Sequence, residues 1–272
     1  MNGFPWAALA LNAAVSAGAV LVVVLAAFAV GVRTGRHRGV DVAWGIGFAA
    51  VAGATYGMSA GHGDAARRVL VLVLTAVWGL RLALHIAWRS RGHGEDPRYE
   101  RMLAKAPGRR DLYALRMVYL LQGALILLVS LPVQIASYAP SEPSLLAVIG
   151  TVVWGVGLCF EAVGDHQLAR FRADPAHRGQ IMDRGLWSWT RHPNYFGDFC
   201  VWWGLFLVAC EAGPWPALLA ALSPLTMSFL LLNGSGKPLL ERHMADRPGY
   251  AAYAARTSGF FPRPPRRDRP PR

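Results

Sequence analysis

Long apolar runs, separated by short polar segments, make up most of the chain. Several of them reach or approach the roughly 20 apolar residues that a helix needs to cross a bilayer. They cover approximately residues 5–31, 40–61, 69–88, 114–136, 144–163, 197–212 and 216–233. This pattern predicts an all-α fold, a polytopic membrane helix bundle with about seven transmembrane helices. The last two runs are short and are expected to form a tight hairpin or two tilted helices.

The composition supports a membrane location. Of the 272 residues, 54% are apolar or aromatic and 16% are charged, whereas about 25% of residues are charged in a soluble domain. A water-soluble fold is therefore not expected. No basic segment precedes the first apolar run, so we expect a retained span rather than a cleaved signal. The three cysteines lie inside apolar runs without a Cys-x-x-Cys pair, so no metal or redox site is expected.

The positive charge of the chain is distributed unevenly along it. Lys and Arg number 28 against 16 Asp and Glu, a formal net charge of +12. Most of the basic residues fall in residues 33–38, 89–111, 164–191 and 233–272, on one side of the predicted spans. The positive-inside rule makes that side cytoplasmic, with the N-terminus outside and the C-terminus inside, as expected in a bacterial inner membrane. Because topology explains the basic excess, nucleic-acid binding is not expected.

The domain organisation follows from the same pattern. We expect one transmembrane domain over residues 1–262, in a protein that is a monomer. Residues 263–272 are rich in Pro and Arg. They are expected to form an extended cytoplasmic tail that touches anionic lipid headgroups.

Ionisable side chains near the cytoplasmic ends of the spans are the first functional signal. Such a residue costs about 2.5–3.5 kcal/mol at the centre of a bilayer, so it usually faces the bundle interior. The residues concerned are Asp41, Arg81, Arg116, Glu161, Asp165 and Asp198. Together they predict a polar cavity open to the cytosol. The alternative is that individual members, above all Arg116 and Asp198, extend to water from helix ends.

The two carboxylates of the fifth span are four residues apart. Glu161 and Asp165 therefore share one helical face and need a cationic or hydroxyl-bearing partner. Arg81, Arg116 or the ribose hydroxyls of a nucleotide are candidates. A metal site with His166 is less favoured, because adjacent residues point to different faces.

The segment from residue 170 to 198 combines arginines with aromatic residues. Arginines can clamp phosphates in a bidentate manner, and aromatic rings offer a flat surface for a heterocycle. The residues are Arg170, Arg172, Arg178, Arg184, Arg191, Trp187, Trp189 and Tyr195. The compact run Arg191-His-Pro-Asn-Tyr-Phe-Gly-Asp198 adds Asn194, which can donate and accept hydrogen bonds. An anionic cofactor with an aromatic base fits this set, and a positive-inside loop with interfacial aromatics is the alternative.

Two further segments have equally simple explanations. Between Arg89 and Tyr99, Glu95 and Asp96 either order the loop by pairing with Arg98 and Arg101 or contact a cofactor. Residues 235–253 form a short amphipathic helix and a turn, which either covers a cofactor or lies at the membrane interface.

These motifs resemble the steroid 5-alpha-reductase superfamily, in particular its branch of uncharacterised bacterial membrane proteins. The most specific element is Arg191-His-Pro-Asn-Tyr-Phe-Gly197. Asp41-x-x-Trp-Gly45, Trp78-Gly-Leu-Arg81 and Glu95-Asp-Pro-Arg-Tyr99 are also similar to that branch. Similar runs occur in sterol reductases and isoprenylcysteine carboxyl methyltransferases, so the run is typical of a fold more than of a reaction.

The resemblance implies a fold and a chemistry. It implies seven helices around a pocket, NADPH entering from the cytosol, and reduction of a carbon–carbon double bond conjugated to a ketone. Residues 154–262 would form the cofactor half. Asp165, Arg172 and Asn194 fall where the family binds NADPH, with Gly197 keeping the backbone close.

The chain departs from the family at the substrate carbonyl. The family uses a Glu on the second span and a Tyr on the third, and the nearest matches here are Asp41 and Trp78. An indole donates a hydrogen bond but is not a useful proton donor. Arg81, one turn further on, can stabilise an enolate electrostatically instead.

The leading hypothesis is an integral-membrane NADPH-dependent reductase of a steroid-, isoprenoid- or fatty-type enone. Asp41, Arg81 and Trp78 are the catalytic candidates. The cofactor-binding candidates are Arg116, Glu161, Asp165, Arg172, Arg191, His192, Asn194, Tyr195 and Gly197. The alternatives are a membrane methyltransferase that uses S-adenosylmethionine, which leaves the arginines without a phosphate, and a non-catalytic lipid-binding membrane protein.

Overall fold

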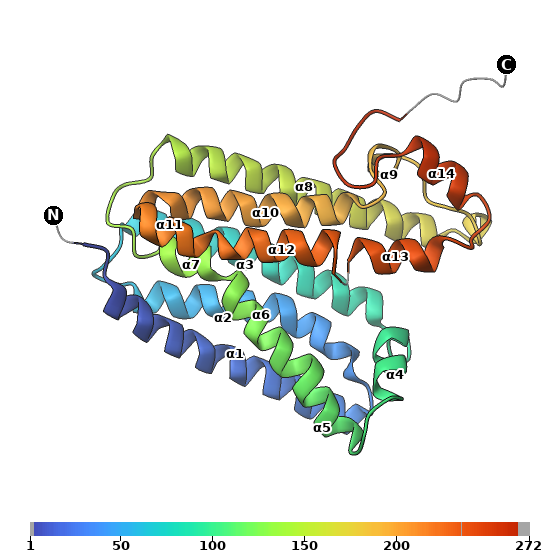
Figure 1. Cartoon of the computed structure of the whole chain (residues 1–272), viewed down its shortest axis with the longest axis horizontal. Helices are drawn as coiled ribbons and strands as arrows, with labels where there is room; N and C mark the ends of the chain where they lie inside the picture. Colours follow the sequence, from blue (N-terminus) through green and yellow to red (C-terminus); the bar gives the residue numbers. More distant parts are fainter. Residues whose placement is uncertain (1–2, 235, 266–272) are drawn as a thin grey trace. The chain divides into compact units, whose positions relative to one another are not determined.

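The computed structural model describes residues 3–234 and 236–265, and these are helical with no strand among them (Figure 1). The chain divides into two compact units. Unit 1 comprises Met1–Val148 and Phe206–Ser223, and unit 2 comprises Ile149–Leu205 and Pro224–Arg272. The predicted Pro/Arg-rich tail lies outside the described residues from position 266 onward.

Unit 1 contains the first three long helices and several short ones. Its elements are α1 (Trp6–Thr34), η1 (His37–Gly39), α2 (Val40–Met58), α3 (Ala65–Ser90), α4 (Pro97–Leu103), α5 (Arg110–Ala114), the π-helix η2 (Leu115–Leu120), α6 (Leu121–Val129), α7 (Leu131–Ala136), η4 (Cys210–Ala212) and α11 (Pro214–Ala220). The elements of unit 2 are η3 (Pro175–His177), α9 (Leu186–Trp189), α13 (Lys237–Met244) and α14 (Tyr250–Arg256). The boundary between the units falls within α8 (Leu145–Ala173), α10 (Pro193–Ala209) and α12 (Leu222–Leu232).

Six helical segments of the described chain are long and apolar enough to cross a membrane. They are Trp6–Thr34, Ala65–Ser90, Arg110–Ala136, Leu145–Ala173, Pro193–Ala212 and Pro214–Met244. The run predicted at residues 40–61 forms α2, which is not among them, because Asp41 and four glycines make it less apolar. The chain is thus an all-helical integral membrane protein, while the orientation of its termini stays a prediction.

Close backbone contact joins α2 to α3 in unit 1. A β-carbon on Gly45 would lie 2.3 Å from the Gly79 carbonyl oxygen, so no larger residue fits there. Small residues permit such close helix packing in membrane proteins. One turn away, Phe48 and Trp78 are fully buried, with ring centroids 5.3 Å apart. This contact fixes the face of α3 that also carries Arg81.

Glycines also join α8 to α10 in unit 2. A β-carbon on Gly157 would lie 2.5 Å from the Gly197 carbonyl oxygen, and one on Gly204 would lie 2.5 Å from that of Gly150. Two spacings of seven residues, 150–157 and 197–204, thus place the two helices backbone to backbone. The contact sets the environment of the polar residues that follow on α8.

A buried ion pair stabilises one end of unit 1. Arg67, in the first turn of α3, is fully buried and pairs with Glu211. Its guanidinium also donates to the carbonyl oxygens of Ser141 at 2.9 Å and Glu142 at 3.0 Å. Glu211 in turn accepts from the Ala147 backbone N–H at 2.8 Å. The pair therefore joins three segments that are distant in sequence, which is a structural role.

Candidate functional site

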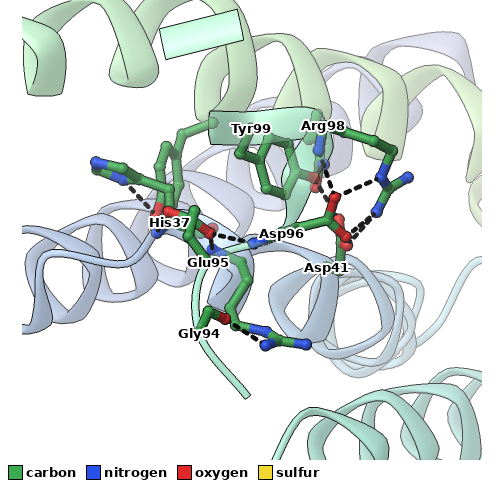
Figure 2. Close-up of polar contacts among 10 residues, drawn as sticks. His37, Asp41, Gly94, Glu95, Asp96, Arg98 and Tyr99 are labelled. Atoms are coloured by element: carbon green, nitrogen blue, oxygen red, sulfur yellow. Dashed lines mark hydrogen bonds and ion pairs between the residues drawn. The ribbon is translucent and has the colours of Figure 1, made fainter. Parts of the chain in front are cut away.

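Three groups of polar side chains are candidates for a functional site. The first, the Asp41 cluster, comprises His37, Asp41, Glu95, Asp96, Arg98 and Tyr99 of unit 1 (Figure 2). The second, the Arg191 cluster, comprises Arg191, His192, Lys237 and Glu241 of unit 2. The buried carboxylates of α8 form a third polar region, also in unit 2.

Asp41 lies in the first turn of α2 and accepts two hydrogen bonds. The Tyr99 hydroxyl donates to its Oδ1 at 2.5 Å, and Nη2 of Arg98 donates to its Oδ2 at 2.9 Å. Arg98 also pairs with Asp96 through Nε at 3.0 Å. Figure 2 shows Tyr99 and Arg98 reaching Asp41 from the segment that follows α3, with Asp96 on the other side of the Arg98 contact. One carboxylate is thus held by a hydroxyl and a guanidinium at once.

Hydrogen bonds from backbone N–H groups to the side chains of Glu95 and Asp96 hold this cluster in place. Asp96 caps α4 by accepting the Arg98 backbone N–H at 2.8 Å, with Pro97 at the first helical position. Glu95 accepts the backbone N–H of His37 at 2.5 Å and of Arg38 at 2.9 Å. These bonds hold the segment before α4 against the start of α2. Asp96 pairs with Arg98, as one of the two alternatives held, whereas Arg101 donates to the Pro97 carbonyl oxygen at 3.1 Å.

Electrostatics keep Tyr99 protonated and its neighbours charged. Burial, reinforced by the Asp41 carboxylate, raises the pKa of Tyr99 well above its usual range. The hydrogen bond to Asp96 raises the pKa of Arg98. Burial works against ionisation of Asp96, but the hydrogen bonds from Arg98 outweigh it and lower the pKa of Asp96. The cluster therefore contains a buried neutral hydroxyl beside a carboxylate, a combination that can orient a polar oxygen by hydrogen bonding.

A second hydrogen-bonded group adjoins the start of α2. His37 is buried, with Nδ1 at 3.1 Å from the Tyr119 hydroxyl and Nε2 at 3.2 Å from Oδ1 of Asp111. Tyr119 lies in the π-helix η2, an irregularity that often occurs at functional sites. A β-carbon on Gly31 would lie 2.5 Å from the Tyr119 hydroxyl, so glycine makes room for this contact.

The other predicted residues of unit 1 lie in different environments. Trp78 is fully buried against Phe48, and Arg81 is half-buried on α3. Arg116 is exposed in η2, in line with the alternative that it extends from a helix end. The roles assigned to these residues stay predictions.

The carboxylates of α8 are buried, as their spacing predicted. Glu161 is 4% exposed and Asp165 is 7% exposed, on the side of α8 that carries Gly157. The Asn194 amide nitrogen lies 3.5 Å from Oδ1 of Asp165. A β-carbon on Gly197 would lie 2.9 Å from that of Glu161, so this glycine serves close packing against α8. Asp165 and Asn194 therefore form a polar pair between two apolar helices.

Arg191 is engaged by the protein itself. Its Nη2 and Nε bind Oε1 of Glu241 at 2.7 and 3.0 Å. Its Nη1 donates to the carbonyl oxygens of Ala254 at 3.0 Å and Thr257 at 2.9 Å. Arg191 thus joins the start of α10 to α13 and to the end of α14, which is a positioning role rather than a phosphate clamp.

His192 shares the same carboxylate. It is 5% exposed, its Nε2 lies 3.2 Å from Oε1 of Glu241, and its ring stacks on Tyr195 with centroids 5.4 Å apart. Burial lowers the pKa of His192 to about 4, although the bond to Glu241 works in the opposite direction. The imidazole is therefore neutral at pH 7.

Side chains at the end of α8 and in the loop that follows it differ in their hydrogen bonds and in their exposure. The Trp187 indole donates to the Gly164 carbonyl oxygen at 3.0 Å, and the Tyr253 hydroxyl donates to the Trp187 carbonyl oxygen at 2.7 Å. Trp189 is 46% exposed. The exposed arginines are Arg170, Arg172, Arg178 and Arg184. The loop therefore presents several guanidinium groups and one indole to the surroundings.

Sequence reasoning did not single out several members of these clusters. Tyr99 and Arg98 stood in a segment with an equally simple explanation, and Glu241 and Lys237 stood in a predicted amphipathic helix. The short separation of Arg98 from Asp96, two residues, could have indicated their ion pair. The partnership of Tyr99 with Asp41 had none, because 58 residues separate them.

Comparison with known proteins identifies a family for this chain. No curated protein and no solved structure matches the chain. A family described as "Protein of unknown function (DUF1295)" matches residues 27–257, which include the Asp41 and Arg191 clusters. The chain therefore belongs to the DUF1295 family.

Proposed function

We propose that the protein is an NADPH-dependent reductase of a conjugated carbon–carbon double bond in a lipid-like enone of steroid, isoprenoid or fatty type. The observation that carries the proposal is the pair of buried carboxylates on α8, Glu161 and Asp165, with the half-buried Asn194 amide beside Asp165. Burial of polar groups is costly, and in membrane spans it usually accompanies function. The resemblance to steroid 5-alpha-reductases supports the same reading.

The residues of unit 2 fit the cofactor chemically. Asp165 can accept hydrogen bonds from ribose hydroxyls, and Asn194 can both donate and accept toward a carboxamide. The exposed guanidiniums of Arg170, Arg172, Arg178 and Arg184 suit phosphates. Arg191 positions the run that carries Asn194, and His192 and Tyr195 stack beside it. When bound, NADPH supplies the hydride.

Unit 1 provides the groups proposed for the substrate carbonyl. Tyr99 offers a neutral hydroxyl that can turn from Asp41 and donate a hydrogen bond to the carbonyl oxygen. Asp41 and Arg98 orient it, since both lie within one hydrogen-bond network. Arg81 supplies positive charge that stabilises negative charge developing on the oxygen. The proposal thus transfers the catalytic role from Trp78 to Tyr99 and keeps Asp41 and Arg81.

Ligand-induced stabilisation tests the proposal. The detergent-purified full chain is heated with NADPH, NADP⁺ or S-adenosylmethionine, since a ligand at 100 times its Kd adds about 2.7 kcal/mol. We expect stabilisation by NADPH, lost in Asn194→Ala and kept in Asn233→Ala, an exposed asparagine of the same unit. Stabilisation by S-adenosylmethionine alone would instead show a methyltransferase. No response to any of the three would favour a lipid-binding protein.

A further inference from the structure

Two cationic side chains of unit 2 lie close to Gly259. A β-carbon on Gly259 would lie 3.1 Å from Nη2 of Arg191 and 3.1 Å from Nζ of Lys237. Arg191 comes from the segment before α10 and Lys237 from α13, so three separate parts of unit 2 meet here. A side chain at position 259 would therefore crowd both nitrogen atoms, and glycine leaves this space open.

The charges at this place do not balance. Glu241 is the acidic partner of Arg191, and it also binds His192, which is neutral at pH 7. Lys237 is half-buried and makes no ion pair within residues 3–234 and 236–265. One carboxylate thus faces two permanent cations, which leaves a surplus positive charge. A partly buried cation without a counter-ion favours binding of an anion.

A polar hollow lies along the same segment. It has a volume of about 320 Å³ and its lining includes Thr257, Ser258, Gly259 and Arg263. This volume is at the lower end of the range of about 300–1,000 Å³ for small-molecule sites. Arg263 is exposed, and its backbone N–H is bonded to the Trp189 carbonyl oxygen at 3.0 Å, which fixes the position of the residue. The Ser258 hydroxyl adds a neutral donor.

We propose that this hollow, with Lys237, Ser258 and Arg263, binds the phosphate group of an anionic ligand. Arg191 acts as a positioning residue here, because Glu241 and two carbonyl oxygens already engage it. The site goes beyond the proposed reductase activity, which assigns these three residues no role. A soluble nucleotide and an anionic lipid headgroup carry the same phosphate chemistry, and the experiment below separates these sources.

The experiment measures binding to the full chain in nanodiscs. Soluble probes are pyrophosphate and 2′,5′-ADP, measured by calorimetry in phosphatidylcholine discs. The lipid probe is phosphatidylglycerol, whose retention is measured by native mass spectrometry. The variants are Lys237→Gln and Arg263→Gln, with Lys237→Arg as the charge-conserving variant. Arg242→Gln is the matched control, because it removes an exposed cation of the same helix that, unlike Lys237, is not among the atoms nearest to Gly259 in the lining of the hollow.

The proposal expects at least one probe to bind the native chain and to bind Lys237→Gln about tenfold more weakly, since a charge-assisted hydrogen bond is lost. Lys237→Arg and Arg242→Gln should bind within about twofold of the native chain. Binding of 2′,5′-ADP alone identifies a nucleotide, and retention of phosphatidylglycerol alone identifies a lipid headgroup. Equal binding by Lys237→Gln and Arg242→Gln, or no binding of any probe, overturns the proposal. If no probe distinguishes Lys237→Gln from the native chain while Asn194→Ala has lost stabilisation by NADPH, the phosphate site fails and the reductase proposal stands.

Discussion

Units 1 and 2 each contain an arginine that joins distant segments through a glutamate, yet the two environments differ. Arg67 is fully buried, and its partner Glu211 also accepts hydrogen bonds from Ser144 and Ala147. Arg191 has a side chain that is 14% exposed and a partner, Glu241, that is 25% exposed. The first pair is buried, with side chains 0% and 8% exposed. The second stands beside further polar groups.

The difference lies in the balance of charge. One cation meets one anion in the Arg67 region, where Arg67 also donates to backbone carbonyl oxygens and Glu211 also accepts from backbone N–H groups. The Arg191 region brings Lys237 and His192 to a single carboxylate. A balanced buried pair serves the fold alone, whereas a region with surplus charge is available for a ligand. The same residue types therefore have different uses, which depend on burial and on the number of counter-ions.

The largest expected effect is at Arg67. Arg67→Met leaves Glu211 buried without its cation, and we expect a loss of about 3–5 kcal/mol in the free energy of unfolding. Unfolding in mixed micelles measures this loss. Arg68→Met is the matched control, because Arg68 is only half-buried and binds Ser59 and Tyr56. Equal losses for the two variants would show that burial of Arg67 is not decisive.

A smaller loss is expected at Arg191. Arg191→Ala removes bonds to Glu241 and to two carbonyl oxygens at a partly exposed place, at an expected cost of about 2–3 kcal/mol. Arg191→Lys should recover part of this, since it keeps the charge but not the forked geometry. The same unfolding assay applies, and full recovery by Lys would contradict a role for the fork.

The next effect is a dependence of stability on pH through His192. Its pKa in the folded chain is about 4, below the unperturbed value of about 6.5. Between these values the unfolded chain binds more protons, so stability is fully present above pH 6.5 and falls as pH decreases toward 4. The slope from this group is at most about 1.4 kcal/mol per pH unit. His192→Gln should flatten that part of the profile, and an unchanged slope would assign it to other groups.

The smallest change in stability is expected in the Asp41 cluster. The side chains of Arg98 and Asp41 are 48% and 23% exposed, so Arg98→Ala should cost no more than about 1 kcal/mol. Tyr99→Phe likewise removes only one hydroxyl, and under the proposed function it should still reduce turnover far more than it reduces stability. A loss comparable to that of Arg67→Met would make the cluster structural.

The apolar runs predicted most of the helices well, because a membrane span must carry a long apolar segment in its own sequence. The predicted runs and the span-like segments differ where that signal was weak. Asp41 and four glycines make α2 less apolar than the six span-like segments, and the last of these extends beyond the predicted run at 216–233 to Met244. The burial of Glu161 and Asp165 was also predictable, since their spacing places both on one face.

The contacts that define the two clusters were not predictable in this way. Tyr99 and Asp41 are 58 residues apart, and Arg191 and Glu241 are 50 residues apart. No periodicity links such positions. The assignment of Arg191 to phosphates was reasonable for an arginine in a basic loop, but its donors are used by Glu241 and by two carbonyl oxygens.

The sequence alone determines the helical class, the insertion into a membrane and the positions of most spans. The reason is that backbone hydrogen bonding within a helix and transfer of a segment to lipid depend on local sequence. The partner of each charged group is not local. Whether an arginine becomes a buried support, a positioning group or a ligand contact depends on which distant carboxylates and carbonyls folding brings to it. Arg67, Arg191 and Arg98 are chemically identical side chains that differ in their partners and in their burial.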